Sequence, residues 1–214
     1  MQITVLGSGN VGGTLGRRWA EAGHAVAFGV RDPSRGAAAV KGGAALPATA
    51  RVLSIAAAVE QADVVLLATP WAAVGAALQE AGVGNGALDG RVLIDATNPL
   101  APGLTLDVGA DGASGAERVQ AMAPQSRVVK CFNSTGAGNM VEPRYDGAAS
   151  AMFMAGDDPA AKDVVRTLVE VLGFECLDAG GLARSRELES LALLWIGLSI
   201  GDMGRDFALR VVRR

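Results

Sequence analysis

The chain has 214 residues, half of them hydrophobic, and a formal net charge of −3 at pH 7. This length supports a substantial core in one or two domains, and the apolar content excludes an intrinsically disordered protein. The negative net charge argues against a nucleic-acid partner. The longest apolar run, Leu191–Ile200, is about half of a bilayer span. With a first predicted strand at Gln2 and hence no expected signal peptide, we expect a cytoplasmic protein with no membrane partner.

The chain opens with an apolar run containing Ile3, Val5 and Leu6, which predicts a β-strand. This run leads directly into the sequence Gly7-Ser8-Gly9-Asn10-Val11-Gly12. A predicted helix over 10–22 follows, with Val11, Leu15 and Trp19 on one face. A strand, a glycine-rich turn and a helix in this order form the context of a dinucleotide-binding fingerprint.

Each glycine of the fingerprint has its own expected role. Gly7 permits the tight turn, Gly9 lets a diphosphate approach the backbone, and Gly12 allows close packing of helix on strand. The unpaired N–H groups at the start of the helix, together with the helix dipole, then bind the diphosphate.

Strand-like and helical segments alternate along the rest of the chain. The predicted strands are Val26–Val30, Arg51–Leu53, Val64–Ala68, Val92–Asp95, Val128–Phe132, Ala151–Ala155 and Phe174–Leu177. The predicted helices are Ser34–Lys41, Ser54–Gln61, Trp71–Ala81, Ala160–Leu172 and Leu182–Ile200, and Leu104–Gly115 is predicted to be a mobile surface loop. This alternation predicts an α/β fold with a Rossmann-type, doubly wound, mostly parallel sheet.

We expect two parts in this fold. Residues 1–145 form a nucleotide-binding Rossmann core, and residues 146–214 form a short C-terminal β-α-β-α extension. Because the extension is too short for a separate helical domain, we expect it to pack on the same sheet, giving effectively one compact domain.

The end of the second strand distinguishes NAD from NADP. An acidic side chain there would accept hydrogen bonds from the ribose 2′-OH, whereas this chain has Val30 followed by Arg31, with Arg35 four residues on. A guanidinium suits a phosphate because it makes paired, charge-assisted hydrogen bonds. Asp32, in the sequence Asp32-Pro33-Ser34, is typical of a turn or a helix start. The sequence therefore predicts NADP.

The usual acid–base groups are missing. The only histidine, His24, lies in a turn before the second strand, and the only tyrosine, Tyr145, lacks a lysine four residues on. Lys130 lies on a predicted strand, where we expect it to act as a pairing or edge charge. We therefore predict no catalytic side chain. Hydride transfer between a nicotinamide and a flavin-like acceptor fits, because the two rings carry the chemistry and the protein supplies geometry.

The two cysteines, Cys131 and Cys176, each lie in an apolar run without metal-ligand spacing. We expect buried structural thiols, with neither a disulfide nor a metal site.

Further segments carry a family resemblance. They are Ala68-Thr69-Pro70-Trp71, Val129 to Thr135, Asp178 to Leu182, Ser185 to Glu189 and Gly29-Val30-Arg31. Together with the opening fingerprint, this set resembles the F420-dependent NADP oxidoreductase family, whose module also forms the cytoplasmic domain of the STEAP metalloreductases. The resemblance extends from Met1 to about Phe207.

The resemblance implies roles for the matching positions. Ser8, Gly9, Asn10 and Val11 would hold the diphosphate, and Arg31 with Arg35 the 2′-phosphate. The nicotinamide ribose would be bordered by Ala68, Thr69 and Pro70, with the opposite wall formed by Asn98-Pro99 and by Asn133 to Ala137, including Thr135. The chain departs from the family at Val30, often a serine, and at Ser134-Thr135-Gly136, where F420-reducing members have a more apolar, proline-containing stretch.

The family implies NADPH-dependent hydride transfer to a small-molecule acceptor, either the deazaflavin coenzyme F420 or a flavin (FMN or FAD). Two alternatives stay open: a flavin or ferric reductase, and a non-catalytic NADPH-binding sensor or partner subunit. The resemblance also suggests a homodimer. The apolar stripe of the last helix fits core packing better than a dimer interface; its residues are Leu188, Leu191, Ala192, Trp195 and Leu198.

Overall fold

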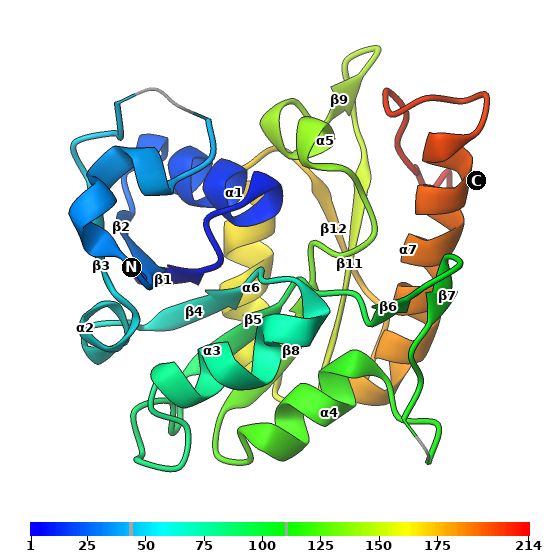
Figure 1. Cartoon of the computed structure of the whole chain (residues 1–214). Helices are drawn as coiled ribbons and strands as arrows, with labels where there is room; N and C mark the ends of the chain where they lie inside the picture. The colour runs from blue at the N-terminus through cyan, green and yellow to red at the C-terminus, as the bar shows by residue number, and fades with distance from the viewer. Residues whose placement is uncertain (43–44, 110) are drawn as a thin grey trace.

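The computed structural model describes residues 1–42, 45–109 and 111–214. Its main feature is an eight-stranded sheet with the strand order β12-β11-β8-β5-β4-β1-β2-β3 (Figure 1). The strands are β1 (Gln2–Leu6), β2 (Ala25–Val30), β3 (Ala50–Ser54), β4 (Val64–Leu67), β5 (Val92–Asp95), β8 (Arg127–Cys131), β11 (Ala151–Gly156) and β12 (Glu175–Asp178).

Six neighbouring strands of this sheet, β3 to β8 in its spatial order, are parallel. The exception is β11, which pairs antiparallel to β8, with Met154 opposite Cys131, while β12 runs parallel to β11. The chain therefore has the predicted Rossmann-type, mostly parallel sheet, and its C-terminal strands continue that sheet. The connection from β8 to β11 contains the five-residue helix α5 (Ala137–Val141) and a short hairpin of β9 (Arg144–Tyr145) and β10 (Ala148–Ala149). It returns the chain antiparallel to β8, unlike the crossovers that join the parallel strands.

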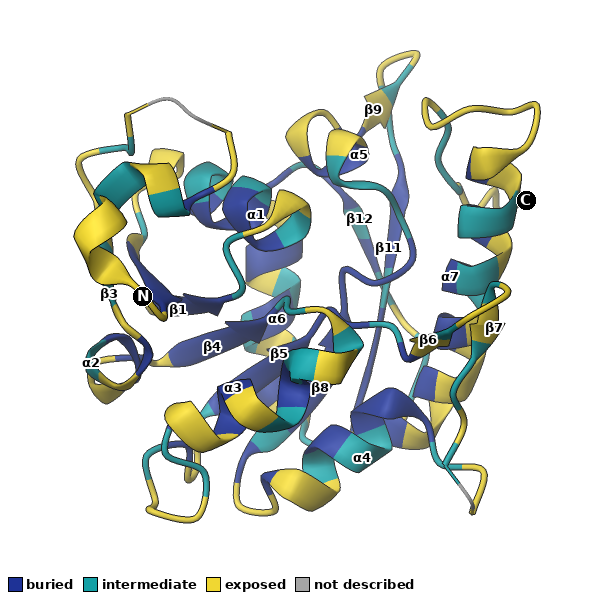
Figure 2. Cartoon of the chain, in the orientation of Figure 1, coloured by how far each residue is buried: buried dark blue, intermediate teal, exposed yellow. Residues whose placement is uncertain are grey.

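Helices cover both faces of the sheet. One core cluster joins the strands to α1 (Asn10–Glu21) and α6 (Pro159–Glu170). The second joins them to α2 (Ile55–Glu60), α3 (Val74–Glu80) and α4 (Gly115–Met122). Figure 2 shows the central strands fully buried between these layers. The last helix, α7 (Ser185–Ile200), follows the one-turn helix η3 (Leu182–Arg184) and packs beside α4 and β11.

Several predicted helices differ from the observed ones. The predicted helix Ser34–Lys41 is instead the 3₁₀ segment η1 (Pro33–Ala39), which is interrupted at Gly36, where φ is +52°. The predicted helix Trp71–Ala81 begins with the 3₁₀ turn η2 (Trp71–Ala73) before α3. Two helices were missed, α4 and α5 (Ala137–Val141). The signal for α4 was the capping box formed by Ser114 and Glu117.

The segment Leu104–Gly115, predicted as a mobile surface loop, contains the strand β7 (Thr105–Leu106). This strand pairs antiparallel with β6 (Leu100–Ala101), so the chain forms a small hairpin after β5. The sequence analysis therefore missed the short strand at Thr105–Leu106. Ala110 lies outside the described residues.

Both cysteines are buried free thiols, as predicted. Burial raises the pKa of Cys176 to about 11, so this thiol stays protonated at neutral pH. On α7, Leu188, Ala192 and Trp195 of the predicted stripe are buried, whereas Leu198 is exposed. None of the helices in the described part of the chain combines the length and apolar character needed to cross a bilayer.

Candidate dinucleotide-binding site

The glycine-rich turn after β1 has the geometry expected of a dinucleotide fingerprint. Gly7 has a φ of +100°, a conformation that side-chain-bearing residues rarely adopt. A Cβ at Gly12 would collide with the carbonyl oxygen of Gly7, so only glycine allows this close packing of α1. A Cβ at Gly9, in contrast, would meet nothing within 4 Å, so open space faces this position.

The start of α1 offers backbone donors toward that space. Gly9 is the N-cap, and no side chain caps the helix or places a negative charge in its first turn. The first intrahelical hydrogen bond runs from the N–H of Gly13 to the carbonyl of Gly9, 2.8 Å away. The N–H groups of Asn10, Val11 and Gly12 precede it, and such groups at a helix N-terminus bind anions. The residues present therefore fit a diphosphate.

Ser8 is also tied to the end of η1 and to the residues that follow it. Its hydroxyl donates a hydrogen bond of 2.6 Å to the carbonyl of Ala39, and its own carbonyl accepts one from the N–H of Lys41 at 2.8 Å. The Ser8 side chain thus holds the turn against this segment, so its contribution to an anion site comes through the backbone.

A cleft of ≈ 630 Å³ extends from this turn across the carboxyl ends of β2 and β4. It brings together residues that the sequence analysis assigned separately to the diphosphate, the 2′-phosphate and the ribose: Gly7, Ser8, Gly9, Arg31, Arg35, Ala68, Thr69 and Pro70. Asp32 and Glu80 also line it, and the remaining side chains are apolar, including Ile55, Ala73 and Ala77. A flat base packs well against such side chains, so the cleft has the chemistry for an adenosine with a charged rim.

The acidic residue at this rim is engaged elsewhere. Oδ1 of Asp32 accepts hydrogen bonds from the backbone N–H of Ser34 at 3.2 Å and from its hydroxyl at 2.5 Å. Asp32 is therefore the N-cap of η1, the role that its sequence context predicted. Arg31 is exposed, and Arg35 donates only a long hydrogen bond, 3.4 Å, to the carbonyl of Ala38.

On the other side of the turn lies the chain after β4. The carbonyl of Ala68 touches Gly7, since a Cβ at Gly7 would lie 2.5 Å from this oxygen. The hydroxyl of Thr69 is buried and has no hydrogen-bond partner among the described residues. Pro70 is exposed at the end of this segment, and together these residues border the cleft.

Asn98 and Asn133 are brought together at the ends of β5 and β8. The Asn98 Nδ2 donates to the carbonyl of Asn133 at 2.9 Å, and the Asn133 Nδ2 donates to Oδ1 of Asn98 at 3.0 Å. Pro99 is buried beside them, against Gly115. Thr135 lies further along the chain, where its hydroxyl accepts a hydrogen bond from Asn139, and Ala137 begins α5. These five residues lie outside the lining of the 630 Å³ cleft.

A buried charge cluster below this pair was missed by the sequence analysis. Lys130 was expected to be a pairing or edge charge, and it pairs in the interior: its side chain is fully buried. Its Nζ lies 3.0 Å from Asp95 Oδ2 and 2.8 Å from Glu189 Oε1. It also donates to the carbonyl of Thr97 at 2.6 Å. The signal available in the sequence was that two acidic residues lie among apolar ones. Asp95 ends the strand β5, and Glu189 lies on the buried face of α7.

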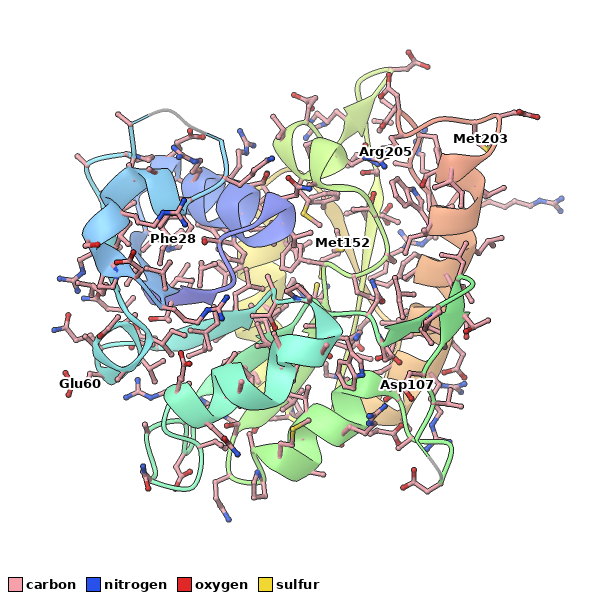
Figure 3. The ribbon with its side chains drawn as sticks, viewed as in Figure 1. Phe28, Glu60, Asp107, Met152, Met203 and Arg205 are labelled. Carbon is pink, nitrogen blue, oxygen red and sulfur yellow. The ribbon has the colours of Figure 1, made fainter. Side chains whose placement is uncertain are left out.

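A second missed group ties the loop after β4 to the β6–β7 hairpin. The indole N–H of Trp71 donates to Asp107 at 3.1 Å, and the guanidinium of Arg118 lies 4.6 Å from the centre of the Trp71 ring. Arg118 also pairs with Asp107 at 3.3 Å. Figure 3 shows Asp107 beside α4. These contacts fix the hairpin next to the Thr69-Pro70 border of the cleft.

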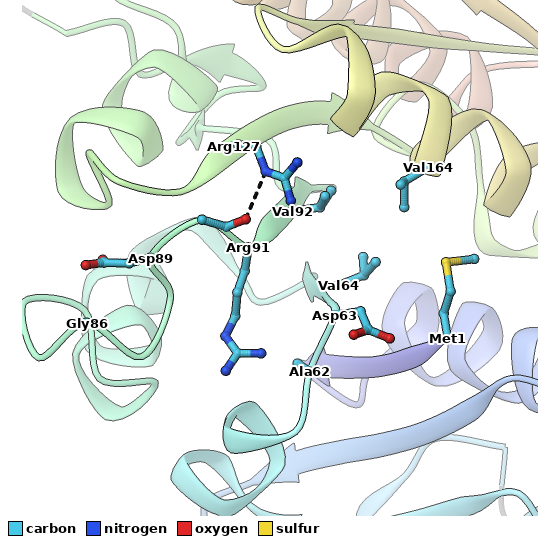
Figure 4. A pocket seen from close by; sticks show the side chains of 11 residues that line it. Met1, Ala62, Asp63, Val64, Gly86, Asp89, Arg91, Val92, Arg127 and Val164 are labelled. Atoms are coloured by element: carbon cyan, nitrogen blue, oxygen red, sulfur yellow. Dashed lines mark hydrogen bonds between the residues drawn. The ribbon is translucent and has the colours of Figure 1, made fainter.

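A second cavity, of ≈ 540 Å³, opens at the opposite, amino-terminal edge of the sheet (Figure 4). Its two arginines are bonded to backbone carbonyls: Arg127 Nε donates to Gly90 at 2.9 Å, and Arg91 to Ala87 and Glu60. Ligands of open α/β sheets bind at the carboxyl ends of the strands, so the first cleft is the candidate site.

The fold and the first cleft define the class of protein, a Rossmann-type dinucleotide-binding protein with a basic rim at the end of its second strand. Residues 2–99 match the family described as NADP oxidoreductase, coenzyme F420-dependent. The chain is also 30% identical to the F420-dependent NADP reductase of Methanothermobacter marburgensis, over 99% of this chain and 98% of that protein. The chain belongs to this family and is an NADP-dependent oxidoreductase.

Two further comparisons place the chain within the family. A crystal structure of a protein from Arthrobacter sp. FB24, provisionally assigned as an F420-dependent NADP reductase, is 33% identical and covers 100% of both chains with a TM-score of 0.87. The metalloreductase STEAP3 of Rattus norvegicus is 29% identical over 90% of this chain, which spans only 36% of that relative's length.

Proposed function

We propose that the protein transfers a hydride between NADP(H) and a deazaflavin of the coenzyme F420 type or a flavin acceptor. The observation that carries this proposal is the single cleft that joins the anion-binding turn, the basic rim of Arg31 and Arg35, and the Thr69-Pro70 border. The relative from Methanothermobacter marburgensis bears the name F420-dependent NADP reductase, which supports the deazaflavin.

Selectivity for the 2′-phosphate rests on charges at the end of β2. Asp32 lines this end of the cleft too, but its Oδ1 is used to cap η1, so its Oδ2 is the one oxygen left to face a ribose hydroxyl. Arg31 and Arg35 line the same end of the cleft and carry two positive charges. Guanidinium groups bind phosphate through paired, charge-assisted hydrogen bonds, so this rim favours NADP(H) over NAD(H).

NADPH would supply the hydride from its own ring. The protein therefore has to bind the two ligands, orient their rings and exclude water from between them. The start of α1 would hold the diphosphate, and Thr69 with Pro70 would border the ribose next to it. Asn98 and Asn133 are locked to each other and form a rigid wall at the neighbouring strand ends. The wall and border consist of amide, hydroxyl and proline groups, which orient two rings without taking part in acid–base chemistry.

The direct test mixes the purified protein with NADPH and oxidised F420 and follows the loss of the deazaflavin's visible absorbance. NADH in place of NADPH and FMN in place of F420 serve as the controls. Loss of absorbance with NADPH and F420, and much slower loss with NADH, is the expected result. Tight NADPH binding with no turnover on either acceptor would contradict the proposal and favour a sensor or partner subunit.

A second candidate function is NADPH-dependent flavin or ferric reduction. Two observations favour it: the 29% identity to STEAP3, named a metalloreductase, and the polar sequence Ser134-Thr135-Gly136 beside the Asn98–Asn133 wall. Under this alternative FMN or FAD accepts the hydride and passes electrons to ferric iron. Rapid reduction of FMN, with no reaction of F420, is the outcome that selects it.

We also propose that the protein is a homodimer. On α7 and just beyond it, four apolar side chains are exposed, with Ile200 at 66% and Leu194 at 58%; the other two are Leu198 and Met203, and Figure 3 shows Met203 at the far end of this helix. An exposed apolar group of this kind marks an interaction surface. Sedimentation equilibrium should give twice the chain mass, and Leu194→Glu should give the monomer mass.

We also propose that the protein is located in the cytoplasm. NADPH is a cytoplasmic reductant, and the two cysteines are free thiols, which persist in reducing compartments. Cell fractionation with an antibody against the chain tests this location, and recovery with secreted or membrane fractions contradicts it.

A further inference from the structure

We propose that Asn133 recognises the carboxamide of a bound nicotinamide through its Oδ1, and that the buried Lys130 cluster positions it to do so. The inference rests on the proposed NADP(H) site and deepens it, because it assigns a specific group of the ligand to one atom of the protein. Asn133 contacts the ligand in this proposal, and Lys130 acts through Asn133 as a positioning residue.

The orientation of the Asn133 amide is determined by its two donor hydrogen bonds. Nδ2 donates to Oδ1 of Asn98 and to the carbonyl of Leu188 on α7, both at 3.0 Å. An amide nitrogen has two N–H groups, so both are used. The oxygen is consequently the remaining polar atom of the side chain, and a flip of the amide would break both bonds.

That oxygen is buried and has no partner among the described residues. Asn133 is only 5% exposed, and none of the described residues donates a hydrogen bond to its Oδ1. Buried amide oxygens are nearly always satisfied in folded proteins, because leaving one unpaired costs much of the free energy of a hydrogen bond. Because this oxygen has almost no accessible surface and Asn133 lies outside the lining of the 630 Å³ cleft, a ligand reaches it only by displacing the atoms that cover it. A ligand N–H group that does so removes the cost of the unpaired oxygen.

The position of Asn133 selects which part of the ligand donates. Gly7, Thr69, Asn98 and Asn133 follow the neighbouring strands β1, β4, β5 and β8, all at the carboxyl edge of the sheet. The diphosphate is centred on the start of α1, and Arg31 draws the adenosine half toward β2. The nicotinamide half therefore extends the other way, over β4, β5 and β8. Its carboxamide carries the N–H donors at that end of the ligand.

A strained backbone directs Asn133 to this place. Phe132, the preceding residue, is buried in the left-handed region with φ = +63°, which is rare for a bulky side chain. Its ring packs edge-on against Trp19 of α1, with centroids 5.6 Å apart, and this packing holds the conformation. Strain of this kind is concentrated at functional sites, and here it turns the chain from β8 toward Asn98.

The Lys130 cluster connects to both partners of the Asn133 amide. Lys130 donates to the carbonyl of Thr97, the residue immediately before Asn98. It also pairs with Glu189, the residue immediately after Leu188 on α7. One buried ammonium thus holds the residue beside Asn98 and the residue beside Leu188. It therefore sets the distance between the two groups that accept hydrogen bonds from the Asn133 amide.

The experiment compares two ligands that differ by one donor group. NADP⁺ has a carboxamide, and its acetylpyridine analogue has a methyl ketone, which keeps the carbonyl and lacks the N–H groups. Equilibrium titration of the wild-type protein should show NADP⁺ binding about tenfold more tightly, the effect of one buried hydrogen bond. The adenosine fragment 2′,5′-ADP serves as a third ligand, since it lacks the nicotinamide altogether.

In Asn133→Ala the two dinucleotides should bind with equal affinity, while the affinity for 2′,5′-ADP stays within about twofold of the wild type. Glu189→Gln, which keeps the size of the side chain and removes its charge, should reduce the tenfold ratio without changing 2′,5′-ADP binding. Lys162→Met is the matched control. Lys162 makes an ion pair of 2.9 Å with Asp178, and neither residue lines the cleft. Its ratio should remain that of the wild type.

Three outcomes would overturn the inference. If the wild-type protein binds both dinucleotides with equal affinity, Oδ1 does not recognise the carboxamide. The same conclusion follows if Asn133→Ala keeps the wild-type ratio of the two affinities. An unchanged ratio in Glu189→Gln overturns the positioning role of the cluster. Failure of the wild type to bind 2′,5′-ADP contradicts the proposed NADP site itself, so the two failures are distinguishable. A loss of folding would lower the affinity for all three ligands together and leave the ratio readable in the remaining folded protein.

Discussion

Lys130 and Glu189, 59 residues apart in the chain, form an ion pair of 2.8 Å in the interior of the protein. Glu189 also accepts hydrogen bonds from the backbone N–H groups of Gly115 at 2.9 Å and Ala116 at 3.2 Å, at the start of α4. One carboxylate thus joins β8, α7 and the positive end of a helix dipole. Asp95 completes the cluster, giving two buried carboxylates to one ammonium, with α4 offsetting part of the excess negative charge.

Removing the ammonium from this cluster should destabilise the fold strongly. Lys130→Met fills a similar volume but leaves Asp95 and Glu189 buried without their cation, which typically costs about 3–5 kcal/mol. Urea unfolding followed by circular dichroism measures the change. In the control Lys162→Met, the pair with Asp178 is partly exposed, and the loss should be at most about 1 kcal/mol. Equal losses in the two variants would show that the cluster is not held as described.

The two glycines of the turn should respond differently to alanine. Gly12→Ala forces a collision with the Gly7 carbonyl, so both the thermal stability and NADPH binding should fall. Gly9→Ala meets no atom within 4 Å, so its stability cost should stay near the roughly 1 kcal/mol of a weakened N-cap. Its methyl group occupies the space assigned to the diphosphate, and NADPH affinity should fall at least about tenfold. Normal NADPH binding by Gly9→Ala would place the diphosphate elsewhere.

Arg31 should determine nucleotide choice. Arg31→Ala should weaken NADPH binding about tenfold or more, since a charge-assisted phosphate contact is lost, and leave NADH binding almost unchanged. Fluorescence titration of the reduced nucleotides measures both affinities, with NADH as the internal control. An equal loss for both nucleotides is inconsistent with a 2′-phosphate contact.

The ion pair of Glu117 with Arg186 should make stability depend on pH in the acid range. Hydrogen bonds from Arg186, at 2.8 and 2.9 Å, lower the pKa of Glu117 from 4.5 to about 2. A pKa lower in the folded than in the unfolded state means that the ionised form stabilises the fold. This contribution is present above pH 4.5 and is lost as the pH falls through about 2.

Melting temperatures of wild type and Glu117→Gln test this dependence. The variant keeps an oxygen that can accept from the Ser114 N–H of the capping box and loses only the charge. It should melt below the wild type at pH 7, and the difference should vanish near pH 2. A difference that stays constant with pH would mean that Glu117 acts through the capping box and not through its charge.

The residues proposed to hold the cofactor were brought into one cleft by short stretches of sequence. The Gly7–Gly12 turn, the start of α1 and the Arg31 rim each lie within a few residues of the strand that precedes them, so local strand–turn–helix geometry determines their arrangement. The mostly parallel sheet was predictable for the same reason, because alternating apolar strands and helices require it. The capping box before α4 was equally local and was overlooked.

The wall at the ends of β5 and β8 was decided by the tertiary structure alone. Asn98 and Asn133 are 35 residues apart in the sequence, and Lys130 and Glu189 are 59 residues apart. At such separations no helical or strand periodicity predicts that two side chains are in contact. The left-handed Phe132 and the antiparallel β11 likewise depend on packing against α1 and on a hairpin connection. The sequence by itself therefore predicted the nucleotide, since the residues proposed to contact it lie close together in the chain. Only the folded chain decided how the wall proposed for the nicotinamide is built, since buried charges and amides find their partners through the packing of distant elements.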